Sequence, residues 1–138
     1  MNVIGTMSGQ AMKLEIIAEE FTVCKVADYN DIDLDRPFVF TGATDKEKSL
    51  VCPTARVPRQ TLEREDGWRA FRIVGVLDFS LIGILARISS CLAENVIGIF
   101  AISTYDTDYI LTRAVDFNHA LEVLSANGYT VETACKSS

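Results

Sequence analysis

Residues 73–112 read IVGVLDFSLIGILARISSCLAENVIGIFAISTYDTDYILT, and this stretch decides the fold. Apolar residues recur at helical spacing from Leu81 to Leu92, which predicts an amphipathic helix that ends near Glu94. The run at 97–103 is rich in β-branched residues and too short for a helix, so it predicts a strand. A turn at 105–108 then leads into a further strand.

The flanking sequence completes a regular order of elements. Trp68–Val74 alternates imperfectly between apolar and polar residues and predicts a strand before the helix. A second helix is expected to begin at Asp116 and to end at Asn127-Gly128, where glycine suits a left-handed C-cap. Tyr129–Thr133 predicts a last strand. The order βαββαβ indicates an α+β, ferredoxin-like fold, in which one antiparallel sheet carries two helices on one face.

The N-terminal half has a weaker pattern. Two short strands are predicted around the acidic pair Glu19-Glu20, and a hairpin is predicted around the charged turn Ala43–Lys48. Residues 57–67 are polar and predict a connector. We therefore expect a lead-in at residues 1–12, a shorter N-terminal half at 13–66 and a complete C-terminal domain at 67–134.

Composition excludes several classes of protein. The chain has 138 residues and a net charge of -6, whereas a nucleic-acid partner would require a basic surface. The longest apolar run, 79–102, is interrupted by Arg87, Glu94 and Asn95, so no membrane span and no membrane partner are expected. The N-terminus lacks the pattern of a signal peptide, and we expect a cytoplasmic protein.

The cysteines and the histidine do not form a metal site. Cys24, Cys52, Cys91 and Cys135 lie far apart in the sequence, and His119 is the one histidine. We expect reduced thiols, mostly buried as small apolar side chains, with no metal and no cofactor. Ser89-Ser90-Cys91 has no base nearby in sequence, so no nucleophile–base pair is predicted.

Two stretches carry a resemblance to a known family. Residues 78–85 (DFSLIGIL) and 99–111 (IFAISTYDTDYIL) resemble the small bacterial ACT-domain proteins, a branch related to the CASTOR arginine sensors and to the regulatory domains of aspartate kinases. Residues 49–53, 57–58 and 67–69 resemble the same branch. The resemblance spans roughly residues 13–133. It implies tandem ACT-like units, the first of them shortened, an amino acid bound at a domain interface, and regulation without catalysis.

The resemblance and elementary chemistry together predict a ligand site at the start of the first helix. Backbone amides at a helix start attract a carboxylate, and Gly83 leaves room for a ligand to approach. The alternative is that Asp78 and Ser80 only cap the helix. The site residues predicted in this segment are Asp78, Phe79, Ser80, Leu81, Ile82 and Gly83.

Three further segments complete the predicted site. Ile99, Phe100 and Ala101 are expected to offer backbone groups to the same ligand. Asp106 and Asp108 can accept hydrogen bonds from an ammonium group, or they can simply build a tight hairpin. The resemblance also implies that Val51 and Cys52 close the pocket, although the same residues suit an ordinary strand.

Three functions therefore compete. The leading hypothesis is a non-enzymatic module that binds an amino acid, forms a homodimer and regulates a protein partner. A second is an assembly module without a ligand, because open sheets present edge strands. A third is an acylphosphatase-like enzyme, but the loop 75–80 lacks the arginine that would hold a phosphate.

Overall fold

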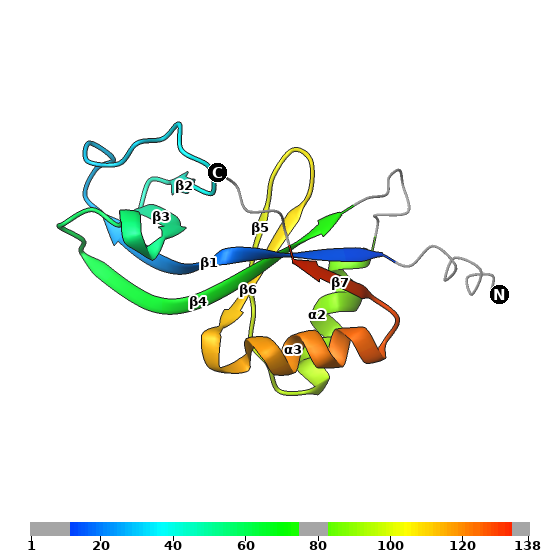
Figure 1. Ribbon diagram of the computed structural model, residues 1–138. Coiled ribbons are helices and arrows are strands. Elements are labelled where there is room, and N and C mark those ends of the chain that lie inside the picture. Colours follow the sequence, from blue (N-terminus) through cyan, green and yellow to red (C-terminus); the bar gives the residue numbers. More distant parts are fainter. Residues whose placement is uncertain (1–11, 75–82, 134–138) are drawn as a thin grey trace. The chain divides into compact units, whose positions relative to one another are not determined.

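The computed structural model describes residues 12–74 and 83–133, and Figure 1 shows the arrangement of their helices and strands. The described chain forms two compact units. We call residues 12–18, 70–74 and 83–133 the helical unit, and residues 19–69 the strand unit. In chain order the elements are β1 (Lys13–Val26), β2 (Phe40–Ala43), β3 (Lys48–Pro53), the 3-10 helix η1 (Thr54–Arg56), β4 (Glu63–Val74), α2 (Ile84–Glu94), β5 (Phe100–Ser103), β6 (Asp108–Arg113), α3 (Ala114–Ala126) and β7 (Thr130–Thr133).

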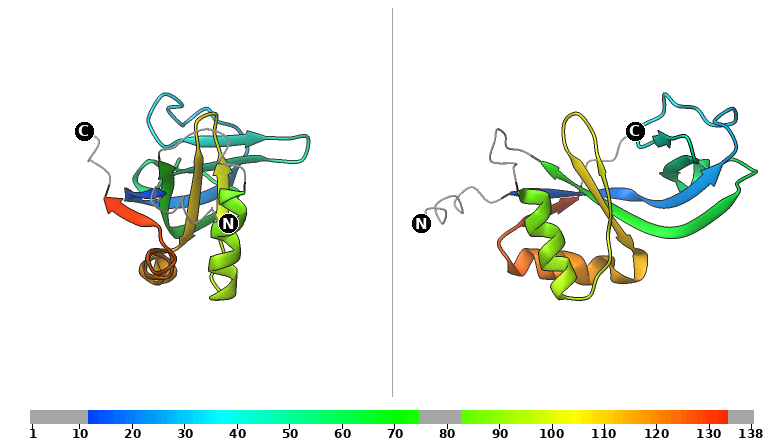
Figure 2. Two further views of the ribbon diagram at one scale, coloured as in Figure 1. Left: turned by 90° about the vertical axis from the view of Figure 1, so that its right-hand side faces the viewer. Right: turned by 180° about the vertical axis from the view of Figure 1, so that it is seen from behind.

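The helical unit has the predicted order of elements. From β4 onward the chain runs strand, α2, strand, strand, α3, strand, which confirms the ferredoxin-like βαββαβ order. Helices α2 and α3 contact each other and lie on the same side of the strands of this unit, as both views in Figure 2 also show. The opposite side of these strands carries no helix among the described residues.

The strand order of the helical unit contains an addition that the sequence did not predict. The order is β7-β1-β4-β6-β5, so β1 lies between β4 and β7. β1 pairs with β7 in parallel, with Leu14 opposite Val131. The expectation of one purely antiparallel sheet is therefore wrong at this pair. The alternating pattern of β1 predicts a strand, but it holds no information about which strand is its neighbour.

Two strands are longer than predicted. The two short strands expected around Glu19-Glu20 are a single strand, β1, because exposed or half-exposed glutamates leave the backbone free to pair. β4 begins at Glu63, so residues 63–67 are strand and not connector. These residues are polar because most of them are exposed, and this exposure conceals the strand in the sequence. The predicted domain ranges 13–66 and 67–134 remain predictions.

The core of the helical unit lies between its helices and its strands. α2 contributes a buried stripe of Ile84, Ile88 and Leu92. The sequence predicted Ile88 and Leu92 on this face, but it placed Leu85 there and Ile84 beside it, whereas Leu85 is only half-buried. α3 contributes Phe117, Ala120 and Leu124, and the strands contribute Leu14, Phe71, Ile73 and Ile110. Each large side chain buried here contributes about 1.5–3 kcal/mol. This core fixes α2 against the sheet and thereby positions the polar face of α2.

The ends of the helices differ from the predictions. α2 begins at Ile84 with Gly83 as its N-cap residue, whereas the sequence suggested Asp78 or Ser80 as the cap; both lie outside the described residues. α3 begins at Ala114, and Asp116 lies in its first turn rather than at the cap. Carboxylates are also favourable in a first turn, which explains the misplaced boundary. The predicted C-terminus is confirmed, with Asn127 as the C-cap and Gly128 at φ 97°.

The strand unit contains no α-helix. Its strand order is β2-β3-β1-β4, and its core consists of Cys24, Val26, Leu50 and Cys52. Pro53 and Pro58 stand where a second helix would follow the hairpin, and proline removes a backbone donor from a helix. The one helical element of this unit is the 3-10 helix η1, which agrees with the expectation of a shortened N-terminal half.

Candidate functional site

The predicted ligand site includes the start of α2. Gly83 has φ 89° and ψ -10°, a left-handed conformation in which most other residues are strained. Its carbonyl accepts a hydrogen bond from the amide of Arg87 at 2.9 Å, which closes the first helical turn. The N-cap residue Gly83 has no side chain and so makes no capping hydrogen bond of its own. The amides of the first turn therefore offer partial positive charge to an anion. The remaining residues predicted here, Asp78 to Ile82, lie outside the described residues.

β5 carries the next three predicted site residues. Ile99 directly precedes the strand and packs against the core, Phe100 is half-buried, and Ala101 is exposed. Phe100 lies opposite Leu111 and Ala101 opposite Ile110 in the antiparallel pair with β6. β5 is the last strand in its sheet order, so it has a single neighbour among the described strands. Ala101 is thus the most accessible of these three residues.

The two predicted aspartates have different surroundings in the hairpin between β5 and β6. The Asp108 carboxylate accepts a hydrogen bond from the Ser103 hydroxyl, and the two residues are opposite each other in the strand pair. Asp106 is exposed in the turn. The structure therefore supports a hairpin-building role for Asp108, while Asp106 is accessible to a ligand. Any contact of either residue with a ligand stays a prediction.

Val51 and Cys52 belong to the strand unit. Both are buried in β3, with Val51 opposite Val23 on one side and Phe40 on the other. Burial raises the pKa of the Cys52 thiol to about 11, so this thiol is protonated at neutral pH. The residues are inert packing groups within their own unit, and their closure of a pocket stays a prediction.

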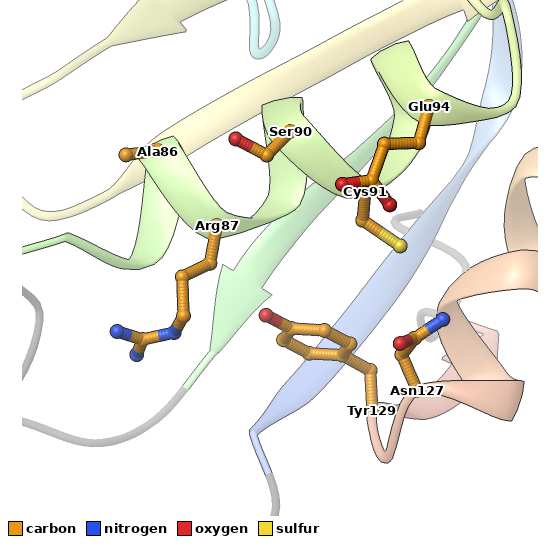
Figure 3. Close-up of a pocket in the computed structure, with 7 residues that line it drawn as sticks. All are labelled: Ala86, Arg87, Ser90, Cys91, Glu94, Asn127 and Tyr129. Atoms are coloured by element: carbon orange, nitrogen blue, oxygen red, sulfur yellow. The ribbon is translucent and has the colours of Figure 1, made fainter.

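A cavity of about 440 Å³ lies beside α2 in the helical unit (Figure 3). One wall is the polar face of α2, and the other comes from the segment that joins α3 to β7. The lining residues are Ala86, Arg87, Ser90, Cys91, Glu94, Asn127 and Tyr129. The sequence analysis did not identify this cavity. The sequence indicates the cavity only through the spacing of Arg87, Ser90, Cys91 and Glu94. These residues are three or four positions apart and therefore lie on one side of a helix.

The titratable groups of the described residues do not support nucleophilic or metal chemistry. Burial, followed by the nearby Glu94 carboxylate, raises the pKa of the Cys91 thiol, so this cysteine is a poor nucleophile. His119 is exposed, and its nearest acidic group is Glu122, with 3.9 Å between the imidazole nitrogen and the carboxylate oxygen. Within residues 12–74 and 83–133, no group of three potential ligands is placed to hold a metal ion.

The fold is an α+β scaffold with a ferredoxin-like order of elements, and a comparison with protein families shows which family it resembles. Residues 63–126, from β4 to the end of α3, match the family model of the ACT domain. In this segment the chain is therefore similar to an ACT domain. This match confirms the family resemblance seen in the sequence.

Several solved structures share the fold of the chain. A protein of Agrobacterium tumefaciens is 29% identical, with a TM-score of 0.81 over 93% of this chain and 97% of that one. An aspartate kinase of Clostridium acetobutylicum is 14% identical, with a TM-score of 0.59 over 85% of this chain and 34% of the enzyme. A candidate C-terminal regulatory domain of aspartate kinase from Porphyromonas gingivalis is 16% identical, with a TM-score of 0.54 over 87% of this chain and 97% of that one. The last two similarities concern the fold alone.

No protein of curated function matches the chain. Among the described residues, no helix has the length and apolar character required to cross a membrane.

Proposed function

We propose that this chain is a cytoplasmic regulatory module that binds a free amino acid and catalyses no reaction. The match of residues 63–126 to the ACT domain is the observation that carries the proposal, because this segment includes the start of α2 and strand β5. The start of α2, whose N-cap residue is a glycine, supports a carboxylate-binding role. The exposed Asp106 is the accessible acceptor for an ammonium group.

The ligand would be held by Gly83 with the preceding residues 78–82 and by Ile99, Phe100 and Ala101. Asp106 and Asp108 on the hairpin complete the proposed set. We further propose that the chain forms a homodimer and that ligand binding changes its contact with a regulated protein partner. A ligand can do so only by binding one of two states more tightly than the other.

A thermal-shift series with the twenty amino acids tests the proposal. A ligand that binds only the folded chain stabilises it by about 2.7 kcal/mol at a concentration of one hundred times its dissociation constant. We expect one amino acid, or a small related group, to raise the melting temperature. Flat curves for all twenty would contradict amino-acid binding.

Two substitutions place the site. Gly83→Trp puts a large side chain at the start of α2, and Gly42→Trp in β2 is the matched control in the strand unit. We expect the ligand-induced shift to disappear in Gly83→Trp and to persist in Gly42→Trp. Ala101→Trp on β5 provides a second block that leaves the helix start intact. Circular dichroism verifies that each variant is folded.

The assembly module remains the second candidate, and the position of β5 at the end of its sheet favours it. Light scattering across a range of protein concentrations separates the two functions. A dimer whose stability no amino acid changes would support assembly alone, whereas a selective melting shift would support sensing.

A further inference from the structure

The cavity beside α2 has opposite charges at its two ends. Arg87 lies in the first turn of α2, and Glu94 is the last residue of the same helix. Figure 3 shows both side chains on the side of α2 that faces Tyr129, with Arg87 at one end of the helix and Glu94 at the other. Neither side chain forms an ion pair with another described residue. Each charge is therefore available to a ligand.

The helix ends strengthen this polarity. Arg87 is close to the positive N-terminus of α2, whereas Glu94 is at its negative C-terminus. Asn127, the C-cap of α3, lines the cavity as well, so the negative end of a second helix lies there. The Asn127 side-chain amide donates to the Val123 carbonyl at 2.8 Å, and its own oxygen is left as an acceptor. A cation is favoured in this part of the cavity and an anion near Arg87.

The wall between the two charged ends is less polar. Tyr129 and Cys91 are partly buried and pack against the core of the helical unit, so they present fixed surface to the cavity. Figure 3 shows the Tyr129 ring opposite the middle of α2. At about 440 Å³ the cavity falls within the range of small-molecule sites, which is roughly 300–1,000 Å³.

We propose that this cavity binds a small zwitterion, with its carboxylate on Arg87, its ammonium on Glu94 and the Asn127 oxygen, and its carbon chain across Tyr129. Two turns of helix separate Arg87 from Glu94, which is about 10 Å along the axis. The two charges are farther apart than this backbone distance, because the Arg87 Nη1 atom lies back at the helix start, 3.5 Å from the position of a Cβ at Gly83. This separation favours an ω-amino acid, in which several carbon atoms lie between carboxylate and amine, over an α-amino acid.

The site differs from the amino-acid site proposed above. That site uses the free amides at the start of α2 together with β5, whereas this cavity uses side chains along α2 and the segment after α3. Arg87 lies beside Gly83, so Gly83→Trp acts on both sites, whereas Ala101→Trp acts on the first site and Glu94→Gln on the second. These last two variants separate the failure of one proposal from the failure of the other.

Calorimetric titration of the full chain with 4-aminobutyrate tests the proposal, with butyrate and butylamine as probes that carry one charge each. We expect 4-aminobutyrate to bind and each single-charge probe to bind at least tenfold more weakly, because each leaves one charge of the cavity unmatched. Arg87→Gln and Glu94→Gln should each weaken 4-aminobutyrate binding by tenfold or more. Two matched variants remove the same charges elsewhere: Arg59→Gln in the strand unit and Glu122→Gln on the exposed side of α3. They should bind as the unmodified chain does.

Three results would overturn the proposal. The first is no heat of binding with 4-aminobutyrate at millimolar concentration. The second is equal affinity for 4-aminobutyrate and for either single-charge probe. The third is an affinity that neither Arg87→Gln nor Glu94→Gln changes, since binding would then occur elsewhere. All four substituted side chains are exposed, so loss of folding is not expected, and circular dichroism verifies it.

Discussion

Thr44 and Thr104 close two hairpins with the same set of hydrogen bonds. The amide of Thr44 donates to the Glu47 carbonyl at 2.8 Å, and the amide of Thr104 donates to the Thr107 carbonyl at the same distance. Each turn also has a hydrogen bond in the opposite direction. The amide of Glu47 donates to the Thr44 hydroxyl oxygen at 3.1 Å, and the amide of Thr107 donates to the Thr104 hydroxyl oxygen at 3.3 Å. One turn belongs to the strand unit and the other to the helical unit.

The likeness extends along both hairpins. β2 and β5 have 4 residues each, and β3 and β6 have 6 each. Phe40 lies opposite Val51 just as Phe100 lies opposite Leu111. The two hairpins therefore share length, register and turn. Their internal geometry supports the interpretation that the strand unit is a shortened version of the helical unit.

Replacing either threonine with valine should destabilise the chain. Valine has a similar shape but lacks the hydroxyl that accepts the amide of the fourth turn residue. A lost hydrogen bond of this kind costs roughly 0.5–1.5 kcal/mol. We expect Thr44→Val and Thr104→Val to lower the free energy of unfolding by similar amounts in urea titrations. The serine variants keep the hydroxyl, so their free energy of unfolding should stay close to that of the unmodified chain. Equal stability of the valine variants and the unmodified chain would contradict a role for these hydroxyls.

The sequence predicts one half of this repeat better than the other. In the helical unit, apolar residues at helical spacing identify α2 and α3, because each helix buries one stripe in the core. In the strand unit, proline and aspartate residues are unfavourable within helices, so the sequence predicts only strands and hairpin turns there. The partner of β1 cannot be predicted, because strand alternation specifies which face is buried but not which strand is the neighbour.

The candidate site is harder to predict than the fold. Asp108 and Asp106 have the same residue type and neighbouring positions, yet one is bonded to Ser103 and the other is exposed. The cavity beside α2 depends on Asn127 and Tyr129, which are distant in sequence from Arg87 and Glu94. Only the folded helical unit brings these residues together, so no local pattern could identify them.

The ion pair between Arg72 and Glu15 should contribute measurably to stability. The Arg72 guanidinium nitrogen lies 2.8 Å from the Glu15 carboxylate, and the two side chains are 31% and 26% exposed. Arg72 also donates to the Tyr109 hydroxyl at 3.0 Å, which holds its side chain in place. In a double-mutant cycle with Arg72→Met and Glu15→Gln, we expect a coupling free energy of about 0.5–1 kcal/mol.

The matched control is the pair formed by Lys13 and Glu132. Its atoms are 3.6 Å apart, and its side chains are 52% and 48% exposed. Water screens such a pair, so its coupling free energy should be close to zero. A coupling for Arg72 and Glu15 that is no larger than this control would contradict the argument.

Asp66 should make the stability of the chain depend on pH in acid. The pKa of Asp66 lies below its ordinary value of 3.8 because Arg64 and then Thr22 donate hydrogen bonds to its carboxylate. The folded chain thus holds this proton less tightly than the unfolded chain. The stabilisation is complete above pH 3.8 and is lost as the pH falls through the lower pKa of the folded state.

Urea titrations at pH 6 and pH 3 measure this effect on either side of the isoelectric point of about 4.7. We expect Asp66→Asn to be less stable than the unmodified chain at pH 6 and to lose less stability between the two values. Glu63→Gln, which removes a neighbouring exposed charge, serves as the control. If Asp66→Asn and Glu63→Gln showed the same pH dependence, the bonds to Asp66 would have no effect on stability.

Gly83→Ala should destabilise the chain through its backbone rather than through a clash. A Cβ at this position would lie 3.5 Å from the Arg87 Nη1 atom, an ordinary contact, but φ is +89°. Alanine in a left-handed conformation costs about 1 kcal/mol relative to glycine. Gly42→Ala in β2 is the control, because its Cβ meets nothing within 4 Å and its φ is not in that region. Alanine at position 42 reduces the conformational entropy of the unfolded chain, so the free energy of unfolding should stay equal or rise. If the two variants had the same urea midpoint, the left-handed start of α2 would not require glycine.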